Sequence, residues 1–90
     1  MTHPIHSHSY KVLADLLTEQ RKELGLLQAD VAALLSKPQS FVSKYESAGR
    51  RLDLIELIDV LHALKTDPHA FMDKLTARIS TLQIPPDFMR

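Results

Sequence analysis

The sequence predicts an all-α domain, and its composition and turn residues are the reasons. Hydrophobic residues make up 44% of the 90 positions, and only two residues are Gly. The apolar residues are mostly Leu, Ala, Ile and Val, a balance that favours packed helices over a Gly-rich sandwich. They recur at helical spacing in short segments that Gly or Pro separates. A chain of this length forms one domain, which buries about 60–65% of its unfolded surface.

The first predicted helix runs from Tyr10 to Leu24. Ser9 can accept the unpaired amides at its start, and Gly25 lies where a left-handed stop is expected. Residues 1–8 hold three His and a Pro without helical periodicity, so we expect a flexible N-terminal arm there. The folded domain is then expected over residues 9–82, followed by a C-terminal tail over residues 83–90.

The next two predicted helices, Gln28–Leu35 and Gln39–Ser47, are short and closely spaced. Pro38 cannot continue the first of them but suits the first turn of the second. Small Ala32 leaves room for two helices that cross at about 90–120°. The residues expected to face inward are Val31, Ala32, Leu35, Val42 and Tyr45. Residues 28–47 are therefore predicted to form a helix-turn-helix.

Two more helices are predicted after this unit. Asp53 and Glu56 have the spacing of a capping box at the start of a helix that continues to Leu64. Asp67 and Pro68 suit an N-cap and a first helical position. The last helix and the tail carry more apolar residues than one small core needs, so we expect a dimer interface there. Its predicted residues are Phe71, Leu75, Ile79, Leu82, Ile84 and Phe88.

Charge is unevenly distributed, although 11 basic and 11 acidic residues give a net charge of zero. Positions 36–52 contain Lys37, Lys44, Arg50 and Arg51 but one acid, Glu46. Positions 53–73 contain five acids and one Lys. Local charge decides which partner a surface attracts. The middle of the chain suits a polyanion, and we expect the acidic segment to face away from it.

Residues 24–64 resemble the Cro/phage-repressor (Xre) helix-turn-helix family. The matching residues are Gln28, Ala32, Gln39, Ser40, Val42 and Glu46. The resemblance implies a five-helix lambda-repressor-like DNA-binding domain. It also implies that Arg21 and Glu46 pair across the first and third helices, and that Gln28 supports Gln39. Three positions depart from the family pattern: Ser36 replaces the usual turn Gly, Lys37 an apolar residue, and Leu27 a capping Thr or Ser.

A recognition helix in the major groove offers its N-terminal side chains to base edges. The amide of Gln39 carries a donor and an acceptor, which suit N6 and N7 of adenine. Ser40 and Ser43 are further candidates for base contacts. Phe41 has two interpretations, packing on a thymine methyl or covering the helix junction. The candidate contacts to the DNA backbone are Gln28, Lys37, Lys44, Arg50 and Arg51.

These features predict a transcription regulator, most simply a repressor, that binds an inverted repeat of double-stranded DNA as a homodimer. Its two recognition helices would then lie about 34 Å apart, one turn of DNA. Two alternatives remain open. An antitoxin would bind DNA in the same way and also neutralise a toxin, whereas an adaptor would keep the fold for protein contacts without binding DNA.

Other functional classes lack support in the sequence. There is no Cys, and therefore no disulfide or thiolate metal site. The apolar runs are far shorter than the roughly 20 residues that span a bilayer, and the N-terminus does not resemble a signal peptide, so we expect a cytoplasmic protein. His3, His6 and His8 alternate and could bind a metal in an extended arm, but a solvent-exposed arm is the simpler interpretation. We expect no enzymatic activity, cofactor or metal.

Overall fold

The computed structural model describes residues 4–82, with side chains over residues 8–80, and confirms the all-α prediction. The described residues form five helices: α1 (Pro4–Glu23), α2 (Gln28–Leu35), α3 (Gln39–Glu46), α4 (Leu54–Ala63) and α5 (Pro68–Leu82). Four predicted starts, those of α2, α3, α4 and α5, are the observed ones. None of the helices in this part of the chain is long and apolar enough to cross a membrane.

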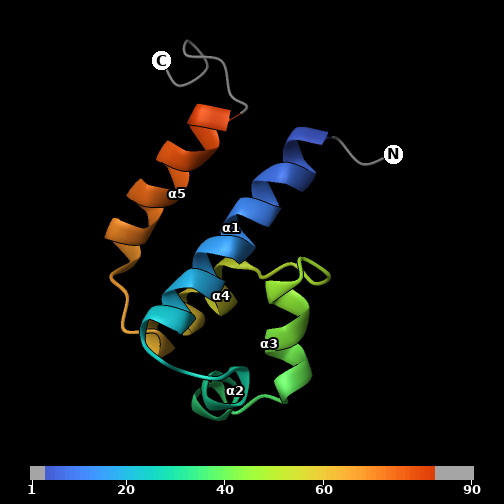
Figure 1. The fold of residues 1–90 in the computed structure, drawn as a ribbon, viewed down its shortest axis with the longest axis vertical. Helices are drawn as coiled ribbons and strands as arrows, with labels where there is room; N and C mark the ends of the chain where they lie inside the picture. Colours follow the sequence, from blue (N-terminus) through green and yellow to red (C-terminus); the bar gives the residue numbers. More distant parts are fainter. Residues whose placement is uncertain (1–3, 83–90) are drawn as a thin grey trace.

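Helices α1 and α5 lie side by side, and α2 and α3 pack together at one end of the molecule (Figure 1). In this view α2 is seen almost along its axis, whereas α3 lies in the plane of the picture. The two helices therefore cross at a steep angle. Helix α1 also contacts α3, and α4 packs against α2. This arrangement supports the helix-turn-helix from two sides and leaves part of α3 exposed.

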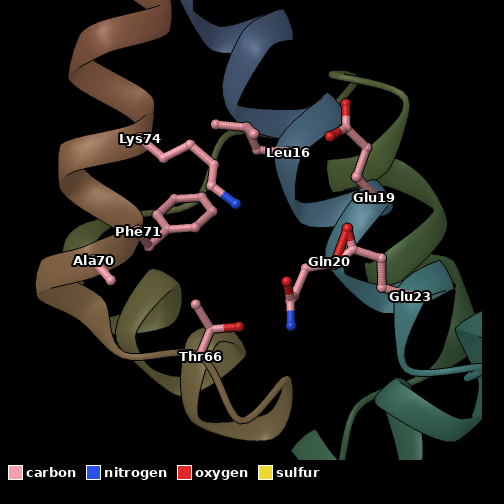
Figure 2. Close-up of a pocket in the computed structure, with 8 residues that line it drawn as sticks. All are labelled: Leu16, Glu19, Gln20, Glu23, Thr66, Ala70, Phe71 and Lys74. Atoms are coloured by element: carbon pink, nitrogen blue, oxygen red, sulfur yellow. The ribbon is translucent and has the colours of Figure 1, made fainter.

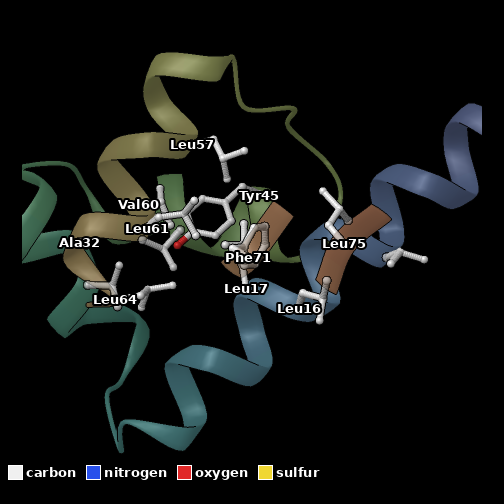
Figure 3. Close-up of a cluster of buried hydrophobic side chains, with 13 residues drawn as sticks. Leu16, Leu17, Ala32, Tyr45, Leu57, Val60, Leu61, Leu64, Phe71 and Leu75 are labelled. Carbon is white, nitrogen blue, oxygen red and sulfur yellow. The ribbon is translucent and has the colours of Figure 1, made fainter. Parts of the chain in front are cut away.

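One hydrophobic core joins the five helices (Figure 3). Tyr45 is the largest of its fully buried side chains, and Leu17, Leu61 and Leu64 lie around it. Four of the residues predicted to face inward in the helix-turn-helix, Val31, Ala32, Val42 and Tyr45, are buried, and Leu35 is partly buried against them. Each fully buried aliphatic side chain contributes about 1.5–3 kcal/mol. The inward faces of α2 and α3 are therefore fixed mainly by apolar burial.

The predicted caps of α4 and α5 are present, whereas Ser9, the predicted N-cap of the first helix, lies inside α1. Glu56 N–H donates to Asp53 Oδ1 at 2.7 Å, and Asp53 N–H donates to Glu56 Oε1 at 3.0 Å, which completes the capping box. Ala70 N–H donates to Asp67 Oδ2 at the start of α5. Gly25 has a φ of 73° and ends α1 in the left-handed conformation, as predicted.

The start of α2 is capped in a way that the sequence analysis missed. Leu27 has no side-chain acceptor, but Asp30 accepts a 2.7 Å hydrogen bond from the Leu27 backbone N–H. This is the half of a capping box that the third helical residue supplies. An acid three residues after the cap position was visible in the sequence and would have indicated it.

Helix α1 begins at Pro4, so the predicted start at Tyr10 is wrong. The backbone of residues 4–8, expected to belong to a flexible arm, is helical. Pro is well suited to a first helical position because its missing N–H would be unpaired there and its φ is already helical. The His3 position and the side chain of His6 lie outside the described residues.

The predicted dimer interface on α5 also needs correction. Phe71 is 4% exposed and Leu75 is 8% exposed, and both belong to the core of the single chain. Ile79 packs against the same core and is partly buried. Ile84, Phe88 and the side chain of Leu82 lie outside the described residues. The apolar stripe of α5 is therefore used to cover α1 within one molecule (Figure 1).

Candidate nucleic-acid interface

Helix α3 carries a polar, exposed face. Its exposed residues are Gln39, Ser40, Ser43 and Lys44, followed by Ser47 just beyond the helix. Spacings of three and four residues place side chains on one side of a helix. Val42 and Tyr45 occupy the opposite side and are buried. The base-contacting side chains expected from the sequence, with the exception of Phe41, thus share one solvent-facing surface.

Phe41 lies over the helix junction. Its ring is half-buried and packs edge-on against Tyr45, with ring centroids 5.6 Å apart. The Arg50 guanidinium lies 4.8 Å from the Phe41 centroid, and the Lys37 ammonium lies 5.5 Å from it. Both distances are typical of cation–π contacts. Of the two interpretations of Phe41, the contacts favour the structural one.

A buried ion pair holds α3 against α1. Arg21 Nε donates to Glu46 Oε2 at 2.7 Å, and Arg21 Nη2 donates to Glu46 Oε1 at 3.0 Å. Their side chains are 10% and 6% exposed. The hydrogen bond to Glu46 raises the pKa of Arg21 above its ordinary value. Arg21 Nη1 also donates to the Leu26 carbonyl at 2.8 Å, so the guanidinium fixes the end of α1 as well.

Gln28 connects this ion pair to the exposed face of α3. Its Nε2 donates to Glu46 Oε1 at 2.9 Å, and its Oε1 lies 3.5 Å from Gln39 Nε2. The second distance is long for an N–H···O hydrogen bond, so this contact orients the Gln39 amide more than it holds it. A continuous polar chain runs from Arg21 in the interior to Gln39 at the surface.

Arg50 was predicted to contact the DNA backbone, but its side chain does not project freely into solvent. Its Nη2 donates to Glu56 Oε2 at 2.8 Å, and its Nη1 donates to Glu56 Oε1 at 3.1 Å. The pairing with Arg50, together with the Asp53 backbone N–H, lowers the pKa of Glu56 to about 2. Glu56 belongs to the segment that was expected to face away from the basic surface, but it turns toward Arg50 instead.

The remaining cations define the positive part of the surface. Lys37, Lys44 and Arg51 are exposed, and no carboxylate of the described residues forms a salt bridge with them. Lys37 precedes α3, Lys44 lies on it, and Arg51 follows it in the connecting loop. Arg50 is thus already engaged by Glu56, whereas these three cations around α3 have no such partner among the described residues.

Tyr10 fixes the loop after α3, a role that the sequence analysis did not identify. Its hydroxyl donates to the Arg50 carbonyl at 2.7 Å and accepts from the Leu52 backbone N–H at 3.1 Å. Its ring also lies 5.6 Å from the Arg51 guanidinium. Burial raises the pKa of Tyr10, so the hydroxyl stays protonated and can donate. No local sequence signal links residues that lie about 40 positions apart.

Two residues in this region hold a left-handed backbone without being Gly. Ser36, in the turn between α2 and α3, has a φ of 57°, and Ala48, directly after α3, has a φ of 63°. The sequence already showed Ser36 in place of the turn Gly usual in the family, whereas no such signal marked Ala48. This conformation costs roughly 1–2 kcal/mol for a residue with a Cβ atom. The surrounding packing must therefore stabilise both turns.

A small cavity lies on another part of the molecule, between α1 and α5 (Figure 2). Its volume is about 70 Å³, and Phe71 and Lys74 reach into it from α5 while Glu19 and Gln20 line it from α1. Pockets for small-molecule ligands usually measure about 300–1,000 Å³. This cavity is too small for such a ligand. Among the described residues, no cluster of three His, Cys, Asp or Glu side chains could bind a metal.

Comparison with known proteins identifies the family. The helix-turn-helix family model matches residues 17–71. A solved XRE-family like protein from Pseudomonas syringae pv. tomato str. DC3000 is 50% identical, with a TM-score of 0.78 over 82% of this chain and 90% of that one. The chain belongs to the XRE-type helix-turn-helix family. The predicted family is confirmed, and no curated protein sequence matches the chain.

More distantly related solved structures share the fold. The restriction-modification controller protein C.Esp1396I is 20% identical and superposes with a TM-score of 0.75, over 81% of this chain and 95% of its own. Its tetramer in complex with its natural 35-base-pair operator is 21% identical, with a TM-score of 0.73 over 79% of this chain and 93% of that one. At this level of identity, the likeness establishes the shared fold.

Proposed function

We propose that the protein is a sequence-specific DNA-binding transcription regulator whose helix α3 enters the major groove. The observation that carries the proposal is the exposed face of α3. Gln39 lies at its N-terminal end, where a recognition helix meets base edges, and the polar chain from Arg21 orients its amide. Supporting this, C.Esp1396I, which shares the fold, has been solved on its operator.

The contacts divide into two kinds. Gln39, Ser40 and Ser43 are the candidates for reading bases, because they are polar, exposed and on one side of α3. The candidate backbone contacts are Gln28, Lys37, Lys44 and Arg51. Gln28 keeps one Nε2 hydrogen for a phosphate while the other bonds Glu46.

The protein acts as a dimer, and by occupying its operator it represses transcription. A single module of this size buries too little surface, about 600–1,000 Å², for tight specific binding. Because Phe71 and Leu75 are buried in the core, we place the interface at another exposed apolar site. Leu54 and Ile55, adjacent at the start of α4, are 68% and 66% exposed. They follow the loop after α3, so a symmetric contact with a second copy at this position joins the two recognition helices rigidly.

Selection of bound duplexes from a random DNA library tests the proposed function. We expect the selected sequences to form an inverted repeat. For each phosphate that the protein neutralises, the affinity should fall by about 0.9 log unit per tenfold rise in salt concentration. Gln39→Ala is expected to cost roughly 1–3 kcal/mol at one base pair in each half-site. Lys44→Ala is the matched control on the same helix and should weaken all sequences alike. A wild-type protein that selects no sequence would contradict the proposal and favour an adaptor.

A charge at the exposed apolar pair tests the dimer. We expect Leu54→Glu to shift the protein to monomer in sedimentation equilibrium, because two like charges would face each other across the symmetry axis. Folding should be unaffected, since the side chain is exposed. Met72→Glu is the control, because Met72 is also exposed but lies on α5. A dimer that survives Leu54→Glu and dissociates with Met72→Glu would place the interface on α5.

A further inference from the structure

We infer that an apolar groove between α2 and the end of α4 binds the C-terminal tail, residues 83–90, of a second copy of this chain. Two adjoining hollows of about 230 and 330 Å³ form the groove, and Leu34 and Ala63 line both of them. Its other lining residues are Leu24, Leu26, Leu35, Asp59, His62 and Lys65. The inference does not depend on the proposed function, because no DNA takes part in this contact.

The groove carries exposed apolar side chains. Leu34 is 62% exposed and Leu24 is 39% exposed, although both are large hydrophobic residues. Contiguous exposed apolar surface of this kind marks a site of interaction. None of the groove-lining residues belongs to α3 or to the first turn of α4. The groove therefore remains accessible while α3 binds DNA and while Leu54 and Ile55 form the proposed dimer contact.

The tail has the composition of a segment that binds such a groove. Its sequence, QIPPDFMR, contains the apolar residues Ile84, Phe88 and Met89. Pro85 and Pro86 favour an extended backbone, which limits the conformational entropy that the tail loses on binding. Extended Pro-containing segments bind apolar grooves for this reason.

Charges on the tail match those along the groove. Lys65 lines one hollow and Asp59 lines the other, and six positions at the helical rise separate them by roughly 9 Å. Asp87 and Arg90 lie three positions apart in the tail, a separation that an extended backbone spans in about 10 Å. Asp87 can therefore pair with Lys65 while Arg90 pairs with Asp59. The two apolar residues between them then lie over the part that the hollows share.

The tail cannot reach the groove of its own chain in this register. Helix α5 begins three positions after Lys65, and its 15 residues run for about 21 Å away from the end of α4 (Figure 1). Asp87 lies five positions beyond Leu82, so an extended backbone carries it back by at most about 18 Å. The matching groove is therefore that of a second copy. A contact made by so short a segment is small and weak, so it adds to the proposed dimer and does not replace it.

NMR of mixed copies of the whole chain tests the inference. The reporter is an isotope-labelled Phe88→Ser chain, whose own tail is impaired, and the donor is the unlabelled chain with its natural tail. Both also carry Leu54→Glu, which removes the proposed dimer contact. Adding the donor should shift the backbone amide signals of Leu34 and Ala63 until they saturate. Unlabelled Phe88→Ser is the matched control donor, because loss of the phenyl ring should weaken the contact roughly tenfold or more.

Three outcomes would overturn the inference. No shift at Leu34 and Ala63 would leave the groove to a different protein. Equal shifts with both donors would show that the copies meet at another surface. If, without any donor, the groove signals of dilute labelled chains differ between the natural tail and Phe88→Ser, the tail binds within its own chain.

A charge exchange tests the register of the tail in the groove. Lys65→Asp in the reporter should lower the affinity by up to about fivefold, the range of a solvent-exposed ion pair, and Asp87→Lys in the donor should restore it. Lys65 has a φ of 55°, which Asp tolerates better than most residues, so the variant should fold. Lys74→Asp, on α5 and outside the groove, is the control and should leave the affinity unchanged. If the double exchange gives no recovery, the charges do not select the tail and the inference is wrong.

Discussion

The molecule contains two bidentate Arg–Glu pairs in different surroundings. Arg21 and Glu46 come from α1 and α3, are separated by 25 positions in sequence, and have side chains 10% and 6% exposed. Arg50 lies in the loop after α3 and Glu56 six positions later in the first turn of α4, with side chains 40% and 24% exposed. The first pair joins two helices, and the second closes a loop.

Burial is the difference that we expect to decide what each ion pair does. A buried charge that loses its partner cannot recover its solvation, so the Arg21–Glu46 pair enforces one position of α3. Water can solvate either member of the exposed pair, and salt screens them. We therefore expect the two pairs to differ in stability, in pH response and in their effect on DNA recognition.

The largest expected effect is the loss of the buried pair. Arg21→Met leaves the Glu46 carboxylate buried without its cation and should lower the free energy of unfolding by roughly 3–5 kcal/mol. Urea denaturation measures this change. Arg50→Met removes the corresponding cation from the exposed pair and should cost clearly less. Equal losses in the two variants would show that burial does not distinguish the pairs.

A substitution in the turn at Ala48, between Glu46 and Arg50, should give a smaller effect and raise the stability instead of lowering it. Ala48 has a φ of 63°, which only Gly adopts without strain, so Ala48→Gly should raise the free energy of unfolding by about 0.5–1 kcal/mol. Gly25→Ala is the matched control, because Gly25 has a φ of 73° and open space around it. Gly25→Ala should lower the free energy of unfolding by a similar amount through backbone strain alone. A loss of stability in Ala48→Gly would mean that packing of the Ala48 methyl group outweighs its strain.

The smallest expected effect is the pH response of the exposed pair. Its pairing lowers the pKa of Glu56 from 4.5 to about 2, so the pair stabilises the folded state fully above pH 4.5 and loses this contribution as the pH falls toward 2. The difference in melting temperature between wild type and Glu56→Gln should therefore shrink over this interval. A difference that stays constant from pH 6 to pH 2 would contradict the pairing.

Much of the fold was predictable because its signals are local. The Asp53–Glu56 capping box, the Asp67 cap and the Gly25 stop each depend on residues within a few positions, and all three are present. The predicted start of α1 was wrong because the His-rich segment before Ser9 lacks apolar periodicity. A backbone helix can nevertheless extend over it from Pro4, since elongation of an existing helix costs little.

The site was predictable in its residue types and less so in its contacts. The family resemblance indicated the Arg21–Glu46 pair and the exposed position of Gln39. It did not indicate that Arg50 pairs with Glu56, nor that Phe41 packs beneath Arg50. In a sequence, every positive residue near a recognition helix suggests a phosphate contact. Only the folded loop shows which of these residues pairs with an acidic side chain.

By itself, the sequence determined the number of helices, most of their ends and the helix-turn-helix, because spacing along the chain fixes which side chains share a helical face. Only the tertiary structure decided where those faces go. It placed Phe71 and Leu75 in the core, although an apolar stripe can equally cover its own domain or a second copy. It also brought Glu46, Gln28 and Gln39 into one chain of hydrogen bonds. Hydrogen bonding depends on distance and direction in space, and these arise only when α1, α2 and α3 pack together.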